Sequence, residues 1–316
     1  MPTARRIPTA ANLLASLALA ALAGCGGDPT GALTDADDAA QDGDAQALTH
    51  PARHVYTLQH APFPGGHPTA LVHLGKGFNA GGPLNLVVHF HGWSNCIAND
   101  VEASGSACTP GAPARIAHNL IGQLDQSGAN AALVAVERAF DQATSIDGRL
   151  AEAGFFRAMI LELLPQIGAL AGRSYTEADL GGLVLSTHSG GYLAVADVLD
   201  RGGLTGHVRQ VLQLDSLYGN FAQFDAWVRG GLGTVRLAVV YSENAGTKAN
   251  AQAMANRATG WVRAAGLSPS ALVDDRTFAT LPDAAFDAPL LFKRSALSHD
   301  GTAQYYFGKL LAHALR

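Results

Sequence analysis

The chain has few charged residues, and it has no cluster of basic ones. Lys, Arg, Asp and Glu make up 15% of its 316 residues. Two of the 21 basic and six of the 26 acidic residues fall within residues 1–50, so residues 51–316 carry 19 basic and 20 acidic residues. A nearly neutral domain without Lys/Arg clusters offers no field that would attract a polyanion. We therefore expect no nucleic-acid partner.

The first residues contain only a short apolar run, too short to span a bilayer permanently. Arg5 and Arg6 precede the run Leu13–Leu22, and small residues lead to Cys25. This order is typical of a cleaved export signal over residues 1–24. The tetrapeptide Leu-Ala-Gly-Cys resembles a bacterial lipobox, which implies lipid attachment at Cys25. An ordinary secretory signal with an incidental cysteine is the alternative.

Such an anchor would hold the protein in the cell envelope and make the membrane a partner. Residue 26 is Gly and not Asp, so the inner-membrane retention signal of Gram-negative lipoproteins is missing. An outer-membrane or surface location is expected if the organism has an outer membrane.

Residues 25–50 have little to bury. This stretch is rich in Gly, Ala and Asp, and no basic residue balances its acids. Such a composition predicts an extended, flexible tether. The spacing and closing glutamate of a calcium loop are absent. The aspartates are Asp28, Asp35, Asp37, Asp38, Asp42 and Asp44.

Cysteine is equally scarce. Besides Cys25 there are only Cys96 and Cys108. An even pair in an exported chain predicts a disulfide, and closing so short a loop contributes roughly 3 kcal/mol. A metal pair is the alternative, but no second cysteine pair completes a zinc site.

Residues 51–316 are long enough for one large domain with a substantial core. Apolar, strand-like runs alternate with helical ones, which predicts a mostly parallel α/β sheet covered by helices on both faces. The expected strands are 55–60, 70–74, 84–90, 131–136, 182–186, 208–214, 235–241 and 290–293. The expected helices are 115–124, 155–170 (kinked or broken at Pro165), 192–199, 221–228, 249–264 and 303–315.

The most informative motif is Leu185-Ser186-Thr187-His188-Ser189-Gly190-Gly191. It lies between an expected strand and an expected helix. A serine at such a sharp turn is held out of both elements, so its hydroxyl is exposed to a base from elsewhere in the fold. Ser189 is therefore the candidate nucleophile.

The expected base is His299, in the loop 295–301 between the last strand and the last helix. Such a loop can reach over the sheet edge toward Ser189. The other downstream histidines, His207 and His313, lie at a strand start and inside a helix. We assign the base by its role and order in the chain.

Two acids follow strands between the serine and the histidine. Asp215 ends the strand 208–214, and Glu243 follows the strand 235–241. Asp215 is preferred because an aspartate between apolar segments is costly to bury without a partner; Glu243 remains the alternative. Asp300 adjoins His299 but should point away from it in an extended loop.

An oxyanion hole needs backbone N–H donors. The amide of Gly190 is one candidate, and the loop that follows Gly92 should supply the other from Trp93 or Ser94. His89 and His91 share one strand face and form a conceivable metal pair, but no carboxylate of matching spacing follows. We expect His91 to brace this loop by hydrogen bonding, and we expect no metal or cofactor.

From Leu84 onward the chain resembles an α/β-hydrolase, with His91-Gly92 after a strand, Ser189, an acid and then His299 in order. The resemblance implies acyl transfer by a serine esterase, lipase or peptidase. No insertion between Val211 and Val235 is large enough for a separate lid domain, so we expect no large lid. Thr187 departs from the pattern, because the family prefers Gly there. The expected function is hydrolysis of a carboxylic ester or amide of small-molecule or polymeric origin. The alternatives are a serine peptidase and an inactive, ligand-binding hydrolase fold.

Overall fold

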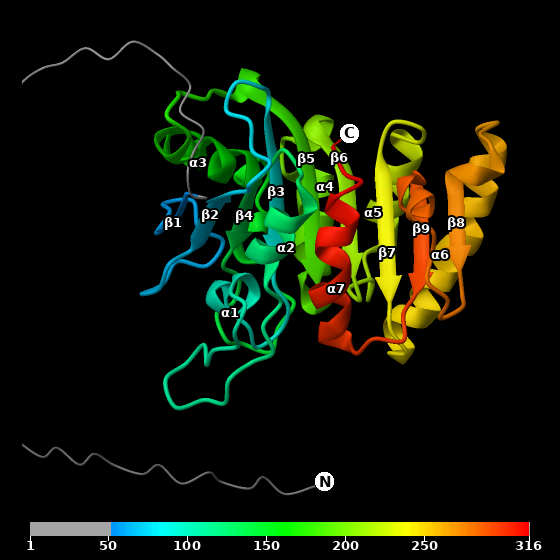
Figure 1. The fold of residues 1–316 in the computed structure, drawn as a ribbon, viewed down its shortest axis with the longest axis horizontal. Helices are drawn as coiled ribbons and strands as arrows, with labels where there is room; N and C mark the ends of the chain where they lie inside the picture. Colours follow the sequence, from blue (N-terminus) through cyan, green and yellow to red (C-terminus); the bar gives the residue numbers. More distant parts are fainter. Residues whose placement is uncertain (1–51, 316) are drawn as a thin grey trace, which may run out of the picture. The chain divides into compact units, whose positions relative to one another are not determined.

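A computed structural model describes residues 52–315. Within this range nine strands form one sheet in the order β1-β2-β4-β3-β5-β6-β7-β9-β8 (Figure 1). The signal segment 1–24, the tether 25–50 and Cys25 lie outside the described residues. The strands are β1 (Arg53–Tyr56), β2 (Ala70–Leu74), β3 (Leu84–Phe90), β4 (Ala132–Val136), β5 (Leu180–His188), β6 (Val208–Leu214), β7 (Arg236–Tyr241), β8 (Leu272–Asp275) and β9 (Leu290–Arg294).

The sheet is parallel except around β2, which pairs antiparallel with β1 and β4. From β4 through β8 every pairing is parallel. The central strands are almost entirely buried and apolar, as expected where helices cover both faces. The carboxyl ends of the parallel strands therefore meet at one edge, where ligand sites of such sheets lie.

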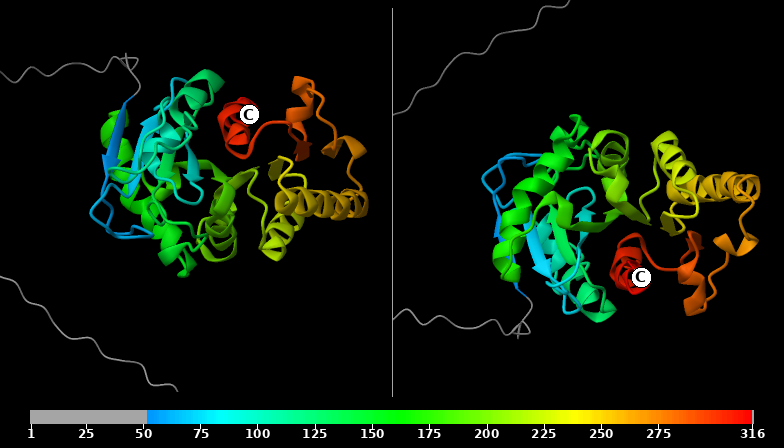
Figure 2. Two further views of the ribbon diagram at one scale, coloured as in Figure 1. Left: turned by 90° about the horizontal axis from the view of Figure 1, so that it is seen from below. Right: turned by 90° about the horizontal axis from the view of Figure 1, so that it is seen from above.

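In residues 52–315 seven α-helices cover the sheet, four on one face and three on the other. The core on one face joins the sheet to α3 (Phe155–Ala171), α4 (Tyr192–Arg201), α5 (Phe221–Gly230) and α6 (Ala245–Ala264). The core on the other face joins it to α1 (Ile97–Val101), α2 (Leu120–Ser127) and α7 (His299–Leu311). Views along the strands show α6 and α7 on opposite sides of the sheet (Figure 2). The predicted α/β architecture is confirmed.

Several predicted boundaries are wrong. The first strand is Arg53–Tyr56, not 55–60; its residues are mostly exposed, so no apolar pattern marks it. Helix α2 begins at Leu120 instead of residue 115. Helix α3 continues through Pro165 without a break. The short helix α1 and the edge strand β8 were not expected from the sequence.

The last helix begins at His299, four residues before the predicted start. Ser298 caps it, and its side chain accepts a hydrogen bond from the Gly301 N–H at 3.1 Å. His299 is therefore the first residue of a helix and not a loop residue. Because its backbone is part of a capped helix, the side chain is held more firmly than in an extended loop.

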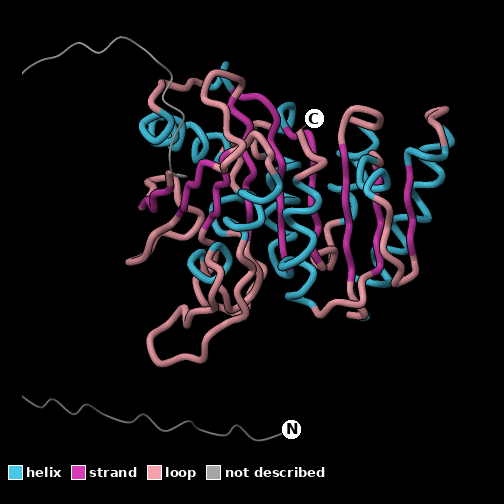
Figure 3. The backbone as a smooth tube through the Cα atoms, viewed as in Figure 1, coloured by secondary structure: helices cyan, strands magenta, loops and turns pink. Residues whose placement is uncertain are grey.

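The predicted disulfide is present, with the Cα atoms of Cys96 and Cys108 5.8 Å apart. It bridges the start of α1 and the long connection between α1 and α2, most of which is loop (Figure 3). Between β6 and β7 the described chain forms only α5 and its turns. In residues 52–315 no helix combines the length and apolarity needed to cross a membrane.

Candidate active site

Ser189 lies directly after β5 in a strained backbone conformation. Its φ angle is 52°, in the left-handed region that non-glycine residues seldom adopt. The chain turns there and enters α4 three residues later, at Tyr192. This is the geometry of a nucleophile elbow, in which strain lifts the serine hydroxyl out of the strand and the helix.

Gly92 allows the loop after β3 to approach the elbow closely. A β-carbon at this position would lie 2.7 Å from the Ser189 Cβ and 3.3 Å from its Oγ. Any larger residue would therefore push the loop away from the serine. The sequence His91-Gly92 thus brings the backbone of the following residues next to the candidate nucleophile.

Thr187 is accommodated by its neighbours, although its position usually prefers glycine in such elbows. Its Oγ1 lies 3.1 Å from the Ser216 Oγ, which donates a 2.6 Å hydrogen bond to the Ser189 carbonyl. Gly191 leaves room for the Thr187 side chain, because a β-carbon at residue 191 would lie only 2.2 Å from the Thr187 Oγ1. The threonine hydroxyl therefore belongs to a chain of hydrogen bonds that supports the turn.

Asp215 and His299 form a close pair. The Asp215 Oδ2 lies 2.7 Å from the His299 Nδ1, and the Asp215 side chain is fully buried. Asp215 has a φ of 47°, so the chain turns sharply as it leaves β6. The carboxylate also accepts hydrogen bonds from the Ser242 N–H at 3.1 Å and from the hydroxyls of Ser242 and Thr247.

These contacts determine the ionisation of Asp215. Burial alone would raise the pKa of its carboxyl, but the hydrogen bonds from His299, Ser242 and Thr247 lower that pKa below its ordinary value. Asp215 is thus an anion held against one imidazole nitrogen. An anion in this position fixes the tautomer of His299 and leaves its Nε2 as the reactive atom.

Glu243, the alternative acid, lies on the surface and makes other contacts. It pairs with the Lys248 Nζ at 2.9 Å and with the Arg294 Nε at 2.6 Å, and half of its side chain is exposed. Hydrogen bonds from Arg294 and Lys248 lower the pKa of its carboxyl to about 2. Of the two acids, only Asp215 is in contact with the His299 ring.

Ser189 and His299 line one pocket of about 310 Å³. Gly92, Trp93, Arg115 and Ile116, from the loops after β3 and before α2, also line it. The amide of Ser94 donates to the Gln142 carbonyl at 2.8 Å, so it is not free to serve an oxyanion. Of the two expected donors in this loop, Trp93 remains the candidate, with the amide of Gly190 as its counterpart across the elbow.

His89, in β3, and His91, just after it, each make hydrogen bonds that support the surrounding structure. His91 lies 2.7 Å from both the Gly92 carbonyl and the Glu137 carboxylate, and this arrangement braces the loop. His89 lies 3.1 Å from both the Ser186 Oγ and the Asp100 Oδ2. Because they have separate partners, they do not form a common metal site.

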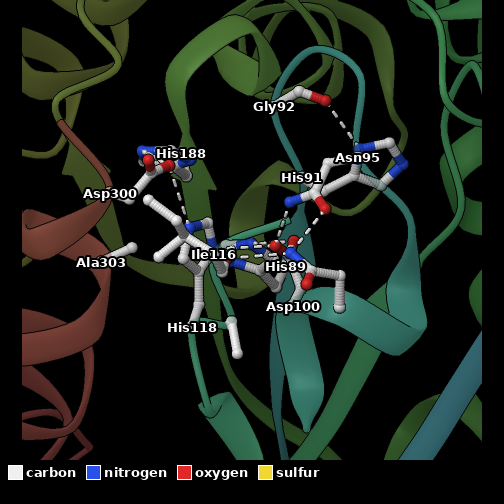
Figure 4. A network of polar contacts seen from close by, with 12 residues as sticks. His89, His91, Gly92, Asn95, Asp100, Ile116, His118, His188, Asp300 and Ala303 are labelled. Carbon is white, nitrogen blue, oxygen red and sulfur yellow. Dashed lines mark hydrogen bonds and ion pairs between the residues drawn. The ribbon is translucent and has the colours of Figure 1, made fainter. Parts of the chain in front are cut away.

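A second polar network lies beside the pocket (Figure 4). The His118 Nδ1 is 2.8 Å from the Asp100 Oδ1, and its Nε2 is 3.4 Å from the Asp300 Oδ1. Burial would lower the pKa of His118, but the two carboxylates raise it to about 9. The ring of His188 meets that of His118 edge-on and that of His299 at a tilt, with centroid distances of 4.6 and 4.5 Å.

Little in the sequence indicates this network. The Asp300 carboxylate is partly exposed and contacts His118, 3.4 Å from its Nε2, which the sequence did not indicate. His118 and Asp100 lie in the poorly patterned stretch between β3 and α2. A histidine directly before the candidate nucleophile, His188, was the only local signal.

The sheet order, the two helical layers and the elbow define an α/β-hydrolase fold. Solved structures with this fold superpose on most of the chain. One is a serine-to-alanine mutant of the feruloyl esterase module from Clostridium thermocellum, complexed with sinapinate: TM-score 0.52, 13% identity, 83% of this chain and 87% of that chain. Another, designated FAE, has a TM-score of 0.53, 13% identity and coverage of 85% and 88%.

No protein-family model matches the sequence. No curated protein matches it either. At 13% identity the structural likeness supports the fold alone, so the function depends on the site.

Proposed function

We propose that this protein is a serine hydrolase that cleaves carboxylic esters through an acyl-enzyme on Ser189. The observation that carries the proposal is the 2.7 Å contact between Asp215 and His299 at the sheet edge where Ser189 adopts a strained elbow. The three residues follow β5, β6 and β9 in the chain, and Ser189 and His299 line the same pocket.

In this mechanism His299 takes the proton of the Ser189 hydroxyl as the oxygen attacks the ester carbonyl. Asp215 holds the imidazole and stabilises its cationic form. The amides of Gly190 and Trp93 donate to the oxyanion that develops in the tetrahedral intermediate. His299 then protonates the leaving alcohol, and water repeats the cycle to release the acid.

The pocket has room for a modest acyl group, and two apolar side chains on its mostly polar lining offer a face to an aliphatic or aromatic part. Its volume of about 310 Å³ is at the lower end for small-molecule sites. Trp93 and Ile116 line it and expose 54% and 55% of their surface. The feruloyl esterase with the same fold was complexed with sinapinate, an aromatic acid, which makes aryl esters the first substrates to test.

Covalent labelling tests the proposal. A fluorophosphonate probe should label the wild-type chain and leave Ser189→Ala unlabelled. Hydrolysis of 4-nitrophenyl acetate should fall on the order of 10⁵-fold or more in the same variant. A folded wild-type chain that neither reacts with the probe nor hydrolyses the ester would instead favour the ligand-binding alternative.

A parallel screen separates esters from amides. Methyl esters of aromatic and short aliphatic acids are compared with aminoacyl amides at equal concentration. Esters should be hydrolysed and amides should not. Preferential cleavage of the amides would favour the serine-peptidase alternative on the same fold.

We further propose that the protein acts outside the cytoplasm, anchored through a lipid on Cys25. The disulfide Cys96–Cys108 supports this location, because such bonds persist in oxidising compartments. Mass spectrometry of the protein extracted from its native membrane should find the mature chain beginning at a lipidated Cys25. A mature chain that begins elsewhere would contradict the anchor.

A further inference from the structure

Two histidines and one aspartate converge beside the candidate triad without belonging to it. The potential ligand atoms of His118, His188 and Asp300 all lie within 4.8 Å of one another. The Asp300 Oδ1 is 3.4 Å from the His118 Nε2 and 3.9 Å from the His188 Nε2. They come from three segments distant in sequence: the stretch before α2, the end of β5 and the first turn of α7.

His118 is oriented as metal-bound histidines commonly are. Its Nδ1 faces the Asp100 Oδ1 at 2.8 Å, which directs the Nε2 toward Asp300. Asp100 is itself fixed by the Asn95 Nδ2 at 2.5 Å and the His89 Nε2 at 3.1 Å. A carboxylate behind a histidine ligand sets the ring orientation and increases the basicity of the ligating nitrogen.

His188 is buried, yet only one of its nitrogens has a partner. The Nε2 lies 3.2 Å from the His299 carbonyl, whereas the Nδ1 has no hydrogen-bond partner within the described residues. A buried polar atom without a partner is costly, and most such atoms in native proteins are satisfied. By contrast, His89 and His91 have partners at both nitrogens.

We propose that His118, His188 and Asp300 bind one borderline divalent metal ion, with Zn²⁺ as the representative case. Ligand atoms about 2.0–2.1 Å from a tetrahedral zinc lie about 3.3 Å from one another. The His118–Asp300 separation of 3.4 Å matches this spacing, whereas the His188 Nε2 is 3.9 Å from Asp300, so the His188 ring must turn or shift toward the other two ligands. The proton that the two carboxylates hold on His118 leaves to solvent as the ion binds. His188 and Asp300 also line the pocket, which leaves the fourth position for water.

Bound metal would join the segments that carry the nucleophile and the base. His188 precedes Ser189 and Asp300 follows His299, whereas no member of the triad is itself a ligand. The ion would therefore act as a cross-link along the catalytic edge. This inference does not depend on the proposed hydrolase function.

Zinc binding to the full chain tests the site. The protein is treated with EDTA, dialysed and titrated with Zn²⁺ against a colorimetric chelator. The wild-type chain should bind one ion, and Asp300→Asn, a change at a partly exposed side chain, should weaken binding about 100-fold or more. Second-sphere changes alone cost 10- to 100-fold.

Matched controls exclude binding at other histidines and acids. His54→Gln and Asp283→Asn alter exposed residues outside the cluster and should bind Zn²⁺ as the wild type does. Ser189→Ala should also retain full binding, which separates the metal site from the hydrolase proposal. The site is disproved if the wild type binds no zinc, or if Asp300→Asn binds as tightly as the controls.

Cobalt supplies a measurement on the wild type that needs no variant to fold. Co²⁺ added to the metal-free chain should give the intense visible absorption of a tetrahedral site, and Zn²⁺ should abolish it. A weak spectrum like that of hydrated Co²⁺ would overturn the proposed geometry.

Discussion

At the scale of single residues, two acids follow neighbouring strands but have different surroundings. Asp215 is buried against His299, whereas Glu243 is half-exposed between Lys248 and Arg294. Burial makes the contacts of Asp215 strong, while solvent and salt screen those of Glu243. The local environment therefore distinguishes the acids where their place in the sequence does not.

Replacement of each acid by its amide provides the first prediction. Asp215→Asn should lower kcat for an aryl ester about 10⁴-fold, because an amide stabilises the wrong tautomer of His299. Glu243→Gln is the matched control and should stay within about threefold of wild type. Steady-state kinetics measure both, and a large loss only in Glu243→Gln would reverse the assignment.

Thr187 permits a test of how the elbow is supported. Thr187→Val keeps the shape of the side chain but removes the hydroxyl near Ser216. The variant should be less stable by about 0.5–1.5 kcal/mol, the usual contribution of one hydrogen bond. The Ser216 hydrogen bond to the Ser189 carbonyl remains, so kcat should change less than about fivefold. Denaturant unfolding and ester kinetics check the two halves of this prediction.

At the scale of elements, the disulfide holds the segment that carries α1. Cys96 directly precedes α1, and Cys108 lies 12 residues further along the chain. Helix α1 contains Asp100, which contacts both His89 and His118. This short helix is therefore positioned by a covalent link and by a buried carboxylate as well as by its own packing.

Removal of the disulfide should destabilise the domain by up to about 3 kcal/mol, since a loop of this length is freed in the unfolded state. The double variant Cys96→Ser/Cys108→Ser should show a lower Tm than the oxidised wild type. Reductant should lower the Tm of the wild type and leave that of the double variant unchanged. An equal response of both to reductant would contradict the role of this bond.

Helix α4 contains the buried carboxyl of Asp197, whose contribution to the free energy of unfolding depends on pH. Burial and a hydrogen bond with Asp147 raise the pKa of Asp197 to about 7, against an attraction from Arg201 at 3.6 Å. Well below pH 4 the carboxyl is protonated in both the folded and the unfolded chain. Between about pH 4 and pH 7 the folded state holds its proton more tightly, so this contribution to stability is lost as the pH rises.

Asp197→Asn should therefore stabilise the protein at pH 8 and have little effect near pH 4. A Tm increase of about 2–4 °C is expected at pH 8, which corresponds to roughly 1 kcal/mol in a domain of this size. Asp200→Asn on the same helix changes an exposed residue and should show no such pH dependence. Thermal unfolding across this pH range measures the effect.

At the scale of the whole molecule, the continuous apolar strands and the elbow motif were readable from the sequence. Buried parallel strands such as β3 and β6 have almost uninterrupted apolar runs, so their positions follow from composition. The chain order of Ser189, Asp215 and His299 likewise predicted their convergence, because each follows a parallel strand. The exposed strand β1 and the short strand β8 lack that pattern, so β1 was misplaced and β8 was not predicted.

The second network could not be predicted in the same way. His118 is positioned by Asp100 and Asp300, which are 18 residues before it and 182 residues after it in the chain. No periodicity relates these residues, since tertiary packing of α1 and α7 alone brings them together. The start of α7 at His299 was not predicted, because a serine such as Ser298 is as common in loops as at helix N-caps.

The position of His299 at the start of α7 links catalysis to the docking of the C-terminal helix. Phe307, Leu310 and Leu311 of this helix are buried against the sheet and α2. A protease cut within α7 would leave Ser189 and Asp215 at the ends of β5 and β6 but remove the packing that holds His299. Ester hydrolysis can therefore serve as a sensitive report of whether the final helix is in place during folding and storage.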